Sequence, residues 1–227
     1  MFTVWGIPGC FRVDNGVPWG NPGDLPSALA LWLIGFGVLM NWNHARRPRE
    51  NGKIERFNGL LDQWGEPQQC GTWRTWKAKL KWVEHMQRDC YPSLQGISRA
   101  QAFPELFVPR HPYTPAAESA LWQIKRVKEF LAEQIWSRKV DGCGNISIYH
   151  RSYRVGRSHA HQMVVLHFDV VSCSWWVADH LGREIRCWPA RQITEQRIRS
   201  LSVGHIRPSV VKAKAAAKPH YAMHGEA

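Results

Sequence analysis

The two most informative stretches of the sequence are Arg12-Val-Asp-Asn-Gly-Val-Pro18 and Glu50-Asn-Gly-Lys-Ile-Glu-Arg-Phe-Asn-Gly59. The first contains Asp14, and the second contains Glu55 as well as Glu50 at its start. Asp14 and Glu55 are each set among Gly and Asn and followed by basic or amide side chains. Two carboxylates presented in this way suggest a pair that holds a divalent metal ion against a phosphodiester, because Mg²⁺ prefers oxygen ligands. Either stretch alone indicates only a turn, since Asn-Gly is a common hairpin loop.

The residues around Asp14 predict a strand, a helix and a second strand. Cys10–Val13 has the composition of a short buried strand that ends at Asp14. Ser27 is a suitable N-cap for a helix through about Ile34. A second buried strand is expected over 38–42, and the predicted order is therefore strand, helix, strand.

Helices are expected to follow. A helix over 52–64, capped by Asn51, would place Glu55 in its first turn, where a carboxylate interacts favourably with the helix dipole. Further helices are predicted over 98–107 and 116–135. An apolar stripe at helical spacing is interpreted as core packing and consists of Trp73, Trp76, Leu80 and Val83.

The hydrophobic period changes to two from Lys139 onward. This pattern predicts short strands over 144–155, 162–171, 174–179 and 184–188, which is typical of a small barrel or sandwich. After Ile206 the chain is rich in Lys, Ala and Pro and is expected to be disordered. The predicted organisation is a core with trailing helices over 1–110, a helical linker over 111–138, a small β-barrel over 139–195 and a basic tail over 196–227.

Composition favours a polyanionic partner. The formal net charge of the 227-residue chain is +12, which points first to nucleic acid and second to an anionic membrane surface. The apolar run 28–40 is short for a membrane span and is interrupted by Gly35 and Gly37, so a buried helix and strand are the preferred interpretation. None of the six cysteines forms a C-x-x-C pair, and no spacing resembles a zinc site. The length and the lack of a signal-peptide pattern lead us to expect reduced thiols in the cytoplasm.

The two acidic segments together resemble the Asp-Asp-Glu transposase and retroviral integrase superfamily. In bacterial insertion-sequence transposases the second Asp sits in an Asp-Asn-Gly turn, as Asp14 does here. The Glu sits in a Pro-x-x-Asn-Gly-x-x-Glu-Arg-x-Asn-Gly segment, which residues 48–59 match. The resemblance covers roughly residues 8 to 195 and implies an α/β plus β chain. It would contain the C-terminal part of an RNase H-like core with trailing helices, then a small SH3-like β-barrel.

The resemblance implies metal-dependent phosphoryl transfer on DNA, with strand cleavage followed by strand transfer. Two Mg²⁺ (or Mn²⁺) ions would be expected in an intact relative, with Asp14 and Glu55 as catalytic and metal-binding residues. The family's first catalytic Asp has no counterpart, because only 13 residues precede Asp14. The chain is therefore expected to be a truncated, frameshifted or split transposase that binds metal weakly and is inactive alone.

Basic and amide residues beside Glu55 and in the predicted barrel are candidate DNA contacts, because Lys and Arg grip phosphates with little sequence reading. The candidates are Arg46, Arg47, Arg49, Asn51, Lys53, Arg56, Asn58, Arg151, Arg154 and Arg157. The alternative is that the residues beside Glu55 form an ordinary solvated face. The barrel could instead pack against the core or another protomer.

Three functional hypotheses follow. In the first, the chain is part of a transposase that acts on transposon ends and target DNA at the bacterial nucleoid, as a homo-oligomer or with a full-length transposase. In the second, it is a non-catalytic protein that binds DNA or transposase and inhibits transposition. In the third, it is a nonfunctional relic, because unpaired strand edges promote aggregation.

Overall fold

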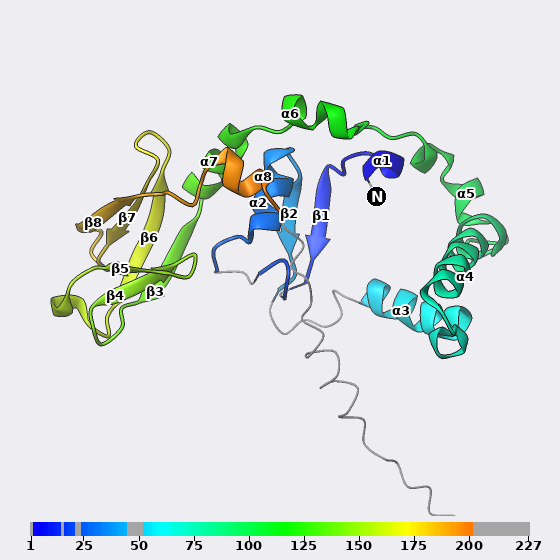
Figure 1. The fold of residues 1–227 in the computed structure, drawn as a ribbon, viewed down its shortest axis with the longest axis horizontal. Coiled ribbons are helices and arrows are strands. Elements are labelled where there is room, and N and C mark those ends of the chain that lie inside the picture. Colours follow the sequence, from blue (N-terminus) through cyan, green and yellow to red (C-terminus); the bar gives the residue numbers. More distant parts are fainter. Residues whose placement is uncertain (1, 15, 21–23, 45–51, 202–227) are drawn as a thin grey trace, which may run out of the picture.

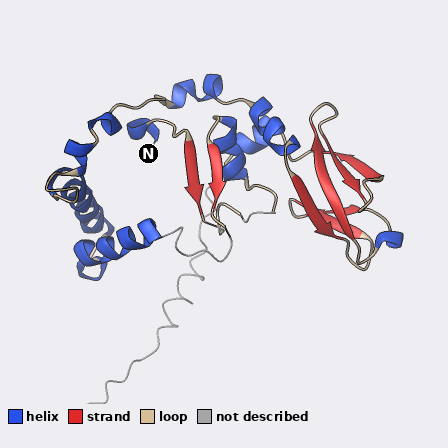
Figure 2. Cartoon of the chain, turned by 180° about the vertical axis from the view of Figure 1, so that it is seen from behind, coloured by secondary structure: helices blue, strands red, loops and turns tan. Residues whose placement is uncertain are grey.

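The computed structural model describes residues 2–14, 16–20, 24–44 and 52–201 and has the shape of an arch (Figure 1). A module of β-strands forms one end of the arch, and a short parallel strand pair with its helix lies in the middle. A helical arm forms the other end. Figure 2 shows from behind that the strand pair lies between the arm and the larger sheet. The architecture is therefore mixed, with α/β and antiparallel β parts.

The predicted strand–helix–strand unit is confirmed. The strands β1 (Cys10–Val13) and β2 (Leu39–Trp42) pair in parallel, and α2 (Ala28–Gly35) connects them. The Ser27 hydroxyl accepts a hydrogen bond from the Ala30 N–H at 3.2 Å and so caps α2. Because the sequence of α2 is apolar on every side, the helix can lie between β2 and the later helix α7 (Ile124–Ala132) with most of its surface buried.

The helical arm is built from α3 (Gly52–Gly65), η2 (Pro67–Gln69), α4 (Trp73–His85), η3 (Met86–Cys90), α5 (Arg99–Ala102) and η4 (Pro104–Phe107). The ring of Trp76 packs against Gly65, where a Cβ atom would crowd it. The prediction that the Trp73 stripe is core packing is correct for Val83, which is buried, but wrong for Trp73, which is 67% exposed. The arm has little besides α3 to cover α4, so the stripe is buried at one end only.

The predicted helix over 116–135 is wrong, because the structure breaks it into η5 (Pro115–Ala117), α6 (Glu118–Leu121) and α7. The chain is extended at Trp122, between α6 and α7. The Trp122 indole packs directly on Gly35 and donates a hydrogen bond to the Trp32 carbonyl at 2.9 Å. Burial of this one ring, which is 3% exposed, thus overrides the helical periodicity.

The β-module contains β3 (Ile135–Lys139), β4 (Asn145–Ile148), β5 (Arg151–Arg154), η6 (Arg157–His159), β6 (Met163–Asp169), β7 (Ser174–Ala178), β8 (Glu184–Pro189) and α8 (Glu195–Arg199). The antiparallel order is β3-β6-β7-β8, and β4 and β5 form a separate hairpin. Within the described residues these strands form two small sheets and no closed barrel. The strand predicted over 144–155 is two strands, and β3 begins where a helix was expected to end.

The core of the β-module is organised around Trp175, which is fully buried. The rings of Trp136, Phe168 and Tyr149 lie 5.8, 5.2 and 6.2 Å from it, centroid to centroid. Such tilted and edge-on aromatic contacts add to the area that each ring buries. The Trp136 indole also donates to the Asp24 carbonyl at 3.2 Å, which links β3 to the segment before α2.

Two further observations bear on the expectations from sequence. None of the helices in the described ranges is long and apolar enough to cross a membrane. All six cysteines, which lie within those ranges, are free thiols. The segment 2–14 also includes α1 (Phe2–Trp5), a short helix whose Phe2 ring stacks on Trp32 at 5.9 Å and so attaches this segment to α2.

The contact between Gly35 and Trp122 predicts a large difference between two glycine substitutions. Gly35→Ala is expected to destabilise the protein by about 1–3 kcal/mol, because the new methyl group would collide with the indole. Gly59→Ala, in the exposed face of α3 where nothing lies within 4 Å, is expected to stabilise it by about 0.5–1 kcal/mol. Urea unfolding measures both free energies, and equal values for the two variants would contradict the packing described.

Candidate functional site

The carboxyl edge of the β1–β2 pair brings polar residues together. Asp14 follows β1 directly, and Asn43 follows β2. The Asn43 N–H donates to the Val13 carbonyl at 2.9 Å, and the Arg12 Nε donates to the Asn43 side-chain oxygen at 2.7 Å. These two hydrogen bonds fix the ends of β1 and β2 side by side. In α/β units this edge is the usual place for a ligand.

Asp14 and Glu55 are both exposed. The carboxylate of Asp14 lies over Gly16, with Oδ2 3.8 Å from the position of a Cβ there. Glu55 lies in the first turn of α3, where every residue from 52 to 59 is exposed. Neither carboxylate makes a hydrogen bond or ion pair with another described residue. Both are therefore accessible as oxygen ligands.

The predicted juxtaposition of Asp14 and Glu55 stays a prediction. The segment that joins β2 to α3 includes residues 45–51, which lie outside the described residues. Figure 1 shows α3 in the helical arm, where it packs against α4. Among the described residues, no group of three His, Cys, Asp or Glu side chains could hold a metal ion.

The candidate DNA contacts fall into two sets. Arg46, Arg47, Arg49 and Asn51 lie outside the described residues, whereas Lys53, Arg56 and Asn58 are exposed on the first two turns of α3. In the β-module, Arg151 and Arg154 lie on β5 and Arg157 begins η6. These three guanidinium groups are exposed and bond to no other described side chain. They are available to an external anion.

A cavity of about 780 Å³ lies between the segment before α2 and the β-module. Its lining comes from four separate stretches of sequence, and it includes basic residues, Tyr149 and Gln192. Sequence reasoning missed all of these residues because no motif joins them. The sequence gives no local signal at the turn either: Tyr149 and His150 both have positive φ, but neither is the Asn or Gly that such a turn usually contains.

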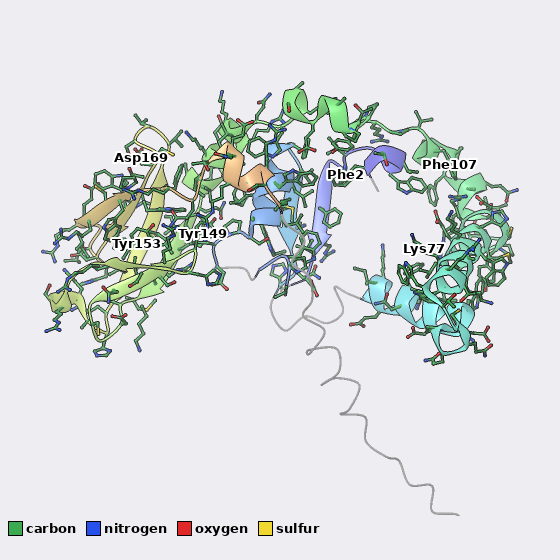
Figure 3. All side chains as sticks on the ribbon, viewed as in Figure 1. Phe2, Lys77, Phe107, Tyr149, Tyr153 and Asp169 are labelled. Carbon is green, nitrogen blue, oxygen red and sulfur yellow. The ribbon has the colours of Figure 1, made fainter. Side chains whose placement is uncertain are left out.

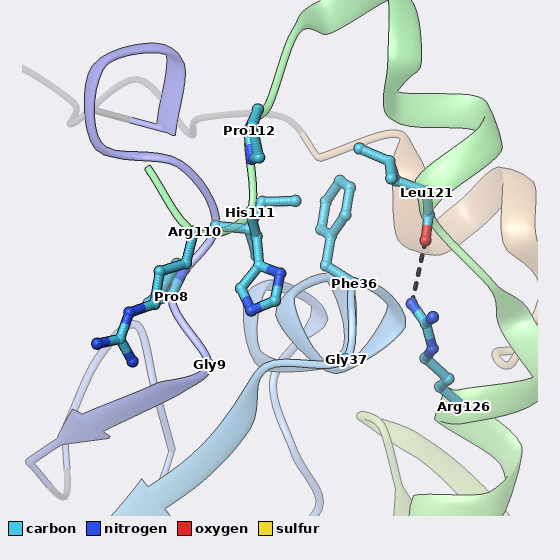
Figure 4. A pocket seen from close by; sticks show the side chains of 10 residues that line it. Pro8, Gly9, Phe36, Gly37, Arg110, His111, Pro112, Leu121 and Arg126 are labelled. Atoms are coloured by element: carbon cyan, nitrogen blue, oxygen red, sulfur yellow. Dashed lines mark hydrogen bonds between the residues drawn. The ribbon is translucent and has the colours of Figure 1, made fainter. Parts of the chain in front are cut away.

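A second cavity, of about 540 Å³, lies where the segment 110–112 returns to the β1 side of α2 (Figure 4). The Arg126 guanidinium at this cavity already donates hydrogen bonds to the carbonyls of Gly35 and Leu121, at 3.1 and 3.0 Å. The segment 110–112 is held in place by a backbone hydrogen bond, in which the Ile7 N–H donates to the His111 carbonyl at 2.8 Å. These contacts give the second cavity a structural role, as the joint between α2 and α7.

Comparison with models of known protein families gives no match to this chain.

The exposed arginines of the β-module predict the salt dependence of DNA binding. Replacing Arg151, Arg154 and Arg157 together with Gln is expected to lower the slope of log affinity against log salt by about 2.7, because each phosphate contact contributes about 0.9. Fluorescence anisotropy with a labelled duplex at several salt concentrations measures the slope. Lys125→Gln, at a side chain 78% exposed on α7, is the control and is expected to leave it unchanged. An unchanged slope in the triple variant would remove these residues from the interface.

Proposed function

We propose that this chain is a DNA-transposition protein of the transposase and integrase type. In this proposal β1, α2 and β2 belong to an RNase H-like core, and the β-module corresponds to an SH3-like domain. The protein holds DNA through its basic surface. Its two carboxylates, Asp14 and Glu55, contribute to metal-dependent phosphoryl transfer at a DNA phosphodiester.

One observation carries the proposal. Asp14 stands directly after the first strand of a parallel strand–helix–strand unit, and Glu55 stands in the first turn of the next helix. This order combines the two sequence motifs with the edge of an α/β unit at which ligands bind. A pair of ordinary hairpin turns would explain neither the parallel pairing of β1 and β2 nor the helical position of Glu55.

The donor chemistry fits a hard divalent cation. Mg²⁺ and Mn²⁺ take carboxylate oxygens and water as ligands, and neither Asp14 nor Glu55 is neutralised by a described cationic partner. Such ions stabilise the charge that develops on attacking and leaving phosphate oxygens. The protein contributes the two carboxylates. Arg12 helps to position the Asp14 carboxylate, because its hydrogen bond to the Asn43 side chain fixes the end of the neighbouring strand.

Charge supports a nucleic-acid partner. The net charge of +12 gives the chain a long-range attraction to a polyanion. The exposed cations on α3 and β5 occupy different parts of the arch, as the positions of these elements in Figure 1 show. A protein that neutralises phosphates at both places would bind an extended DNA segment and would read little of its sequence.

The proposal predicts that the two carboxylates bind metal together. Asp14→Asn and Glu55→Gln are each expected to weaken Mn²⁺ binding about tenfold or more, since each removes one anionic ligand. Electron paramagnetic resonance of free Mn²⁺ measures the affinity. Mn²⁺ is also expected to increase the affinity of the unmodified protein for a labelled DNA duplex, and either substitution should remove that increase.

Asp62→Asn is the matched control, because Asp62 is an exposed carboxylate of the same helix as Glu55. It should leave Mn²⁺ binding unchanged. If the protein does not bind Mn²⁺ and Mn²⁺ does not change its affinity for DNA, but DNA still binds, the results favour a non-catalytic DNA-binding protein over a transposase. If the duplex does not bind at low salt, both fail.

A further inference from the structure

The helical arm contains a thiol, an imidazole and a carboxylate in hydrogen-bond contact. The Cys90 Sγ lies 3.5 Å from the His85 Nε2, and the His85 Nδ1 lies 2.7 Å from the Asp89 Oδ2. The imidazole therefore joins the thiol to the carboxylate through its two ring nitrogens. The cluster is accessible to solvent, because Cys90 is exposed and the His85 side chain is 58% exposed.

The local backbone explains how these three side chains meet. The helix α4 ends at His85, and η3 continues it as a π-helical turn in which the Tyr91 N–H donates to the Met86 carbonyl at 2.8 Å. In an α-helix, residues five apart lie about 140° apart around the axis, so their side chains do not meet. The wider π turn brings both Asp89 and Cys90 beside the His85 ring. Such turns are rare and are frequently found at functional sites.

Packing on both sides holds this turn in place. The ring of Tyr91, which directly follows η3, packs edge-on against Trp64 of α3 with the ring centroids 5.5 Å apart. The next helix, α5, packs against η3. Figure 3 shows the side chains of the arm, where Lys77 of α4 and Phe107 of η4 are labelled. Tertiary contacts therefore fix the turn, in addition to its own hydrogen bonds.

The hydrogen bonds of Asp89 define the tautomer of the imidazole. Arg88 donates to both Asp89 oxygens, from Nε and Nη2, at 2.9 and 2.8 Å, and its guanidinium also lies 5.5 Å from the centroid of the Phe107 ring. The hydrogen bond from Arg88, followed by that from His85, lowers the pKa of Asp89 to about 2. An ionised carboxylate only accepts hydrogen bonds, so the proton of the neutral imidazole is on Nδ1. The lone pair of Nε2 then faces the Cys90 thiol.

This arrangement is the one that activates cysteine nucleophiles. The thiolate is the reactive form of cysteine, and an adjacent base makes it available by accepting the thiol proton. His85 is such a base, and Asp89 positions it. The thiols of Cys10 and Cys187 are also exposed, but they have no hydrogen-bond partner among the described residues. Cys90 is therefore distinguished from them by its neighbours and not by its exposure.

The openness of the cluster indicates the kind of reaction partner. Thiol–disulfide exchange requires an accessible thiolate and a leaving thiol, and the disulfide itself supplies the leaving group. An exposed thiol beside a base meets these requirements without a binding pocket. Acyl transfer would also require hydrogen-bond donors aimed at a developing oxyanion. A small-molecule disulfide is therefore the partner that fits this cluster.

We infer that Cys90 is a reactive thiol that forms mixed disulfides with small-molecule disulfides such as glutathione disulfide. The thiol proton passes to the His85 Nε2 as the Cys90 sulfur attacks one sulfur of the disulfide. A new S–S bond forms to Cys90, the original S–S bond breaks, and the released thiolate takes the proton from the imidazole. The protein thiol is thereby oxidised, and one half of the small disulfide is reduced to a thiol. The inference does not depend on the proposed function.

Incubation of the reduced full chain with glutathione disulfide at neutral pH tests the inference. Samples are quenched with N-ethylmaleimide, and peptide mass spectrometry measures the rate of mixed-disulfide formation at each cysteine. An ordinary thiol is about 3% ionised at neutral pH, so a neighbouring base can increase the rate about 30-fold at most. We expect Cys90 to react about tenfold faster than Cys10 or Cys187, because nucleophilicity falls as a thiol becomes more acidic.

His85→Gln tests the base. This variant is expected to lower the rate at Cys90 about tenfold, to the rate of Cys10, and to leave the rate at Cys187 unchanged. His180→Gln, at an exposed histidine in the turn between β7 and β8, is the matched control and should not change the rate at Cys90. Far-UV circular dichroism of His85→Gln should match that of the unmodified protein, because the histidine side chain lies at the surface.

Two substitutions of Asp89 test its positioning role. Asp89→Asn introduces an amide that can donate to the imidazole as well as accept from it, so the tautomer is no longer fixed, and the rate at Cys90 should fall. Asp89→Glu keeps an anionic acceptor and should restore most of the rate. Equal rates at Cys90 in these two variants would overturn the role given to Asp89.

The inference fails if Cys90 reacts no faster than Cys10 and Cys187. It also fails if His85→Gln keeps its helical signal and leaves the rate at Cys90 unchanged. If His85→Gln loses that signal, the comparison of Asp89→Asn with Asp89→Glu decides in its place. Fast reaction at Cys90 that is lost in His85→Gln and kept in His180→Gln supports the inference.

Discussion

The contact between the Trp122 indole and the bare backbone of Gly35 is the constraint on which the arrangement of the chain depends. Since Gly35 has no side chain, the ring can lie on the end of α2 and donate to the Trp32 carbonyl. The contact stops the helix before Trp122 and starts α7 in a new direction, so that α7 packs on α2 and on β6. The parallel strand pair and the β-module are thereby held to one common helix.

The loop between β1 and α2 places Asp14 close to the 780 Å³ cavity. One end of the β1–β2 pair exposes Asp14, and the loop that follows Asp14 contributes Val17 and Pro18 to the 780 Å³ cavity. The first turn of α2, including Ser27, lines the same cavity. A DNA strand that passes the carboxyl edge of the sheet would therefore meet the cavity within a few residues of the proposed metal ligand.

Local patterns predicted the parts of the fold that local chemistry controls. The apolar residues that follow Ser27 are enough to predict α2. The Asn-Gly pair after Asp14 predicts the end of the strand there. The break at Trp122 could not be predicted, because it depends on a glycine far away in sequence. The Tyr149 turn lacks Asn and Gly and so resembled continuous strand. For the candidate site, the motifs predicted the two carboxylates, and their shared role stays a prediction. The cavity arises from tertiary packing alone.

The turn at Tyr149 and His150 also bears on the order in which the β-module acquires structure. A hairpin whose loop residues disfavour the turn gains little from local closure, so β4 and β5 should pair only after Trp175 and its neighbours have packed. The loop between β6 and β7 is different, because the Asp169 carboxylate accepts from the Ser172 N–H at 2.7 Å and is a strong local organiser. We therefore expect the transition state for folding to contain the β6–β7 hairpin, with β4 and β5 added late.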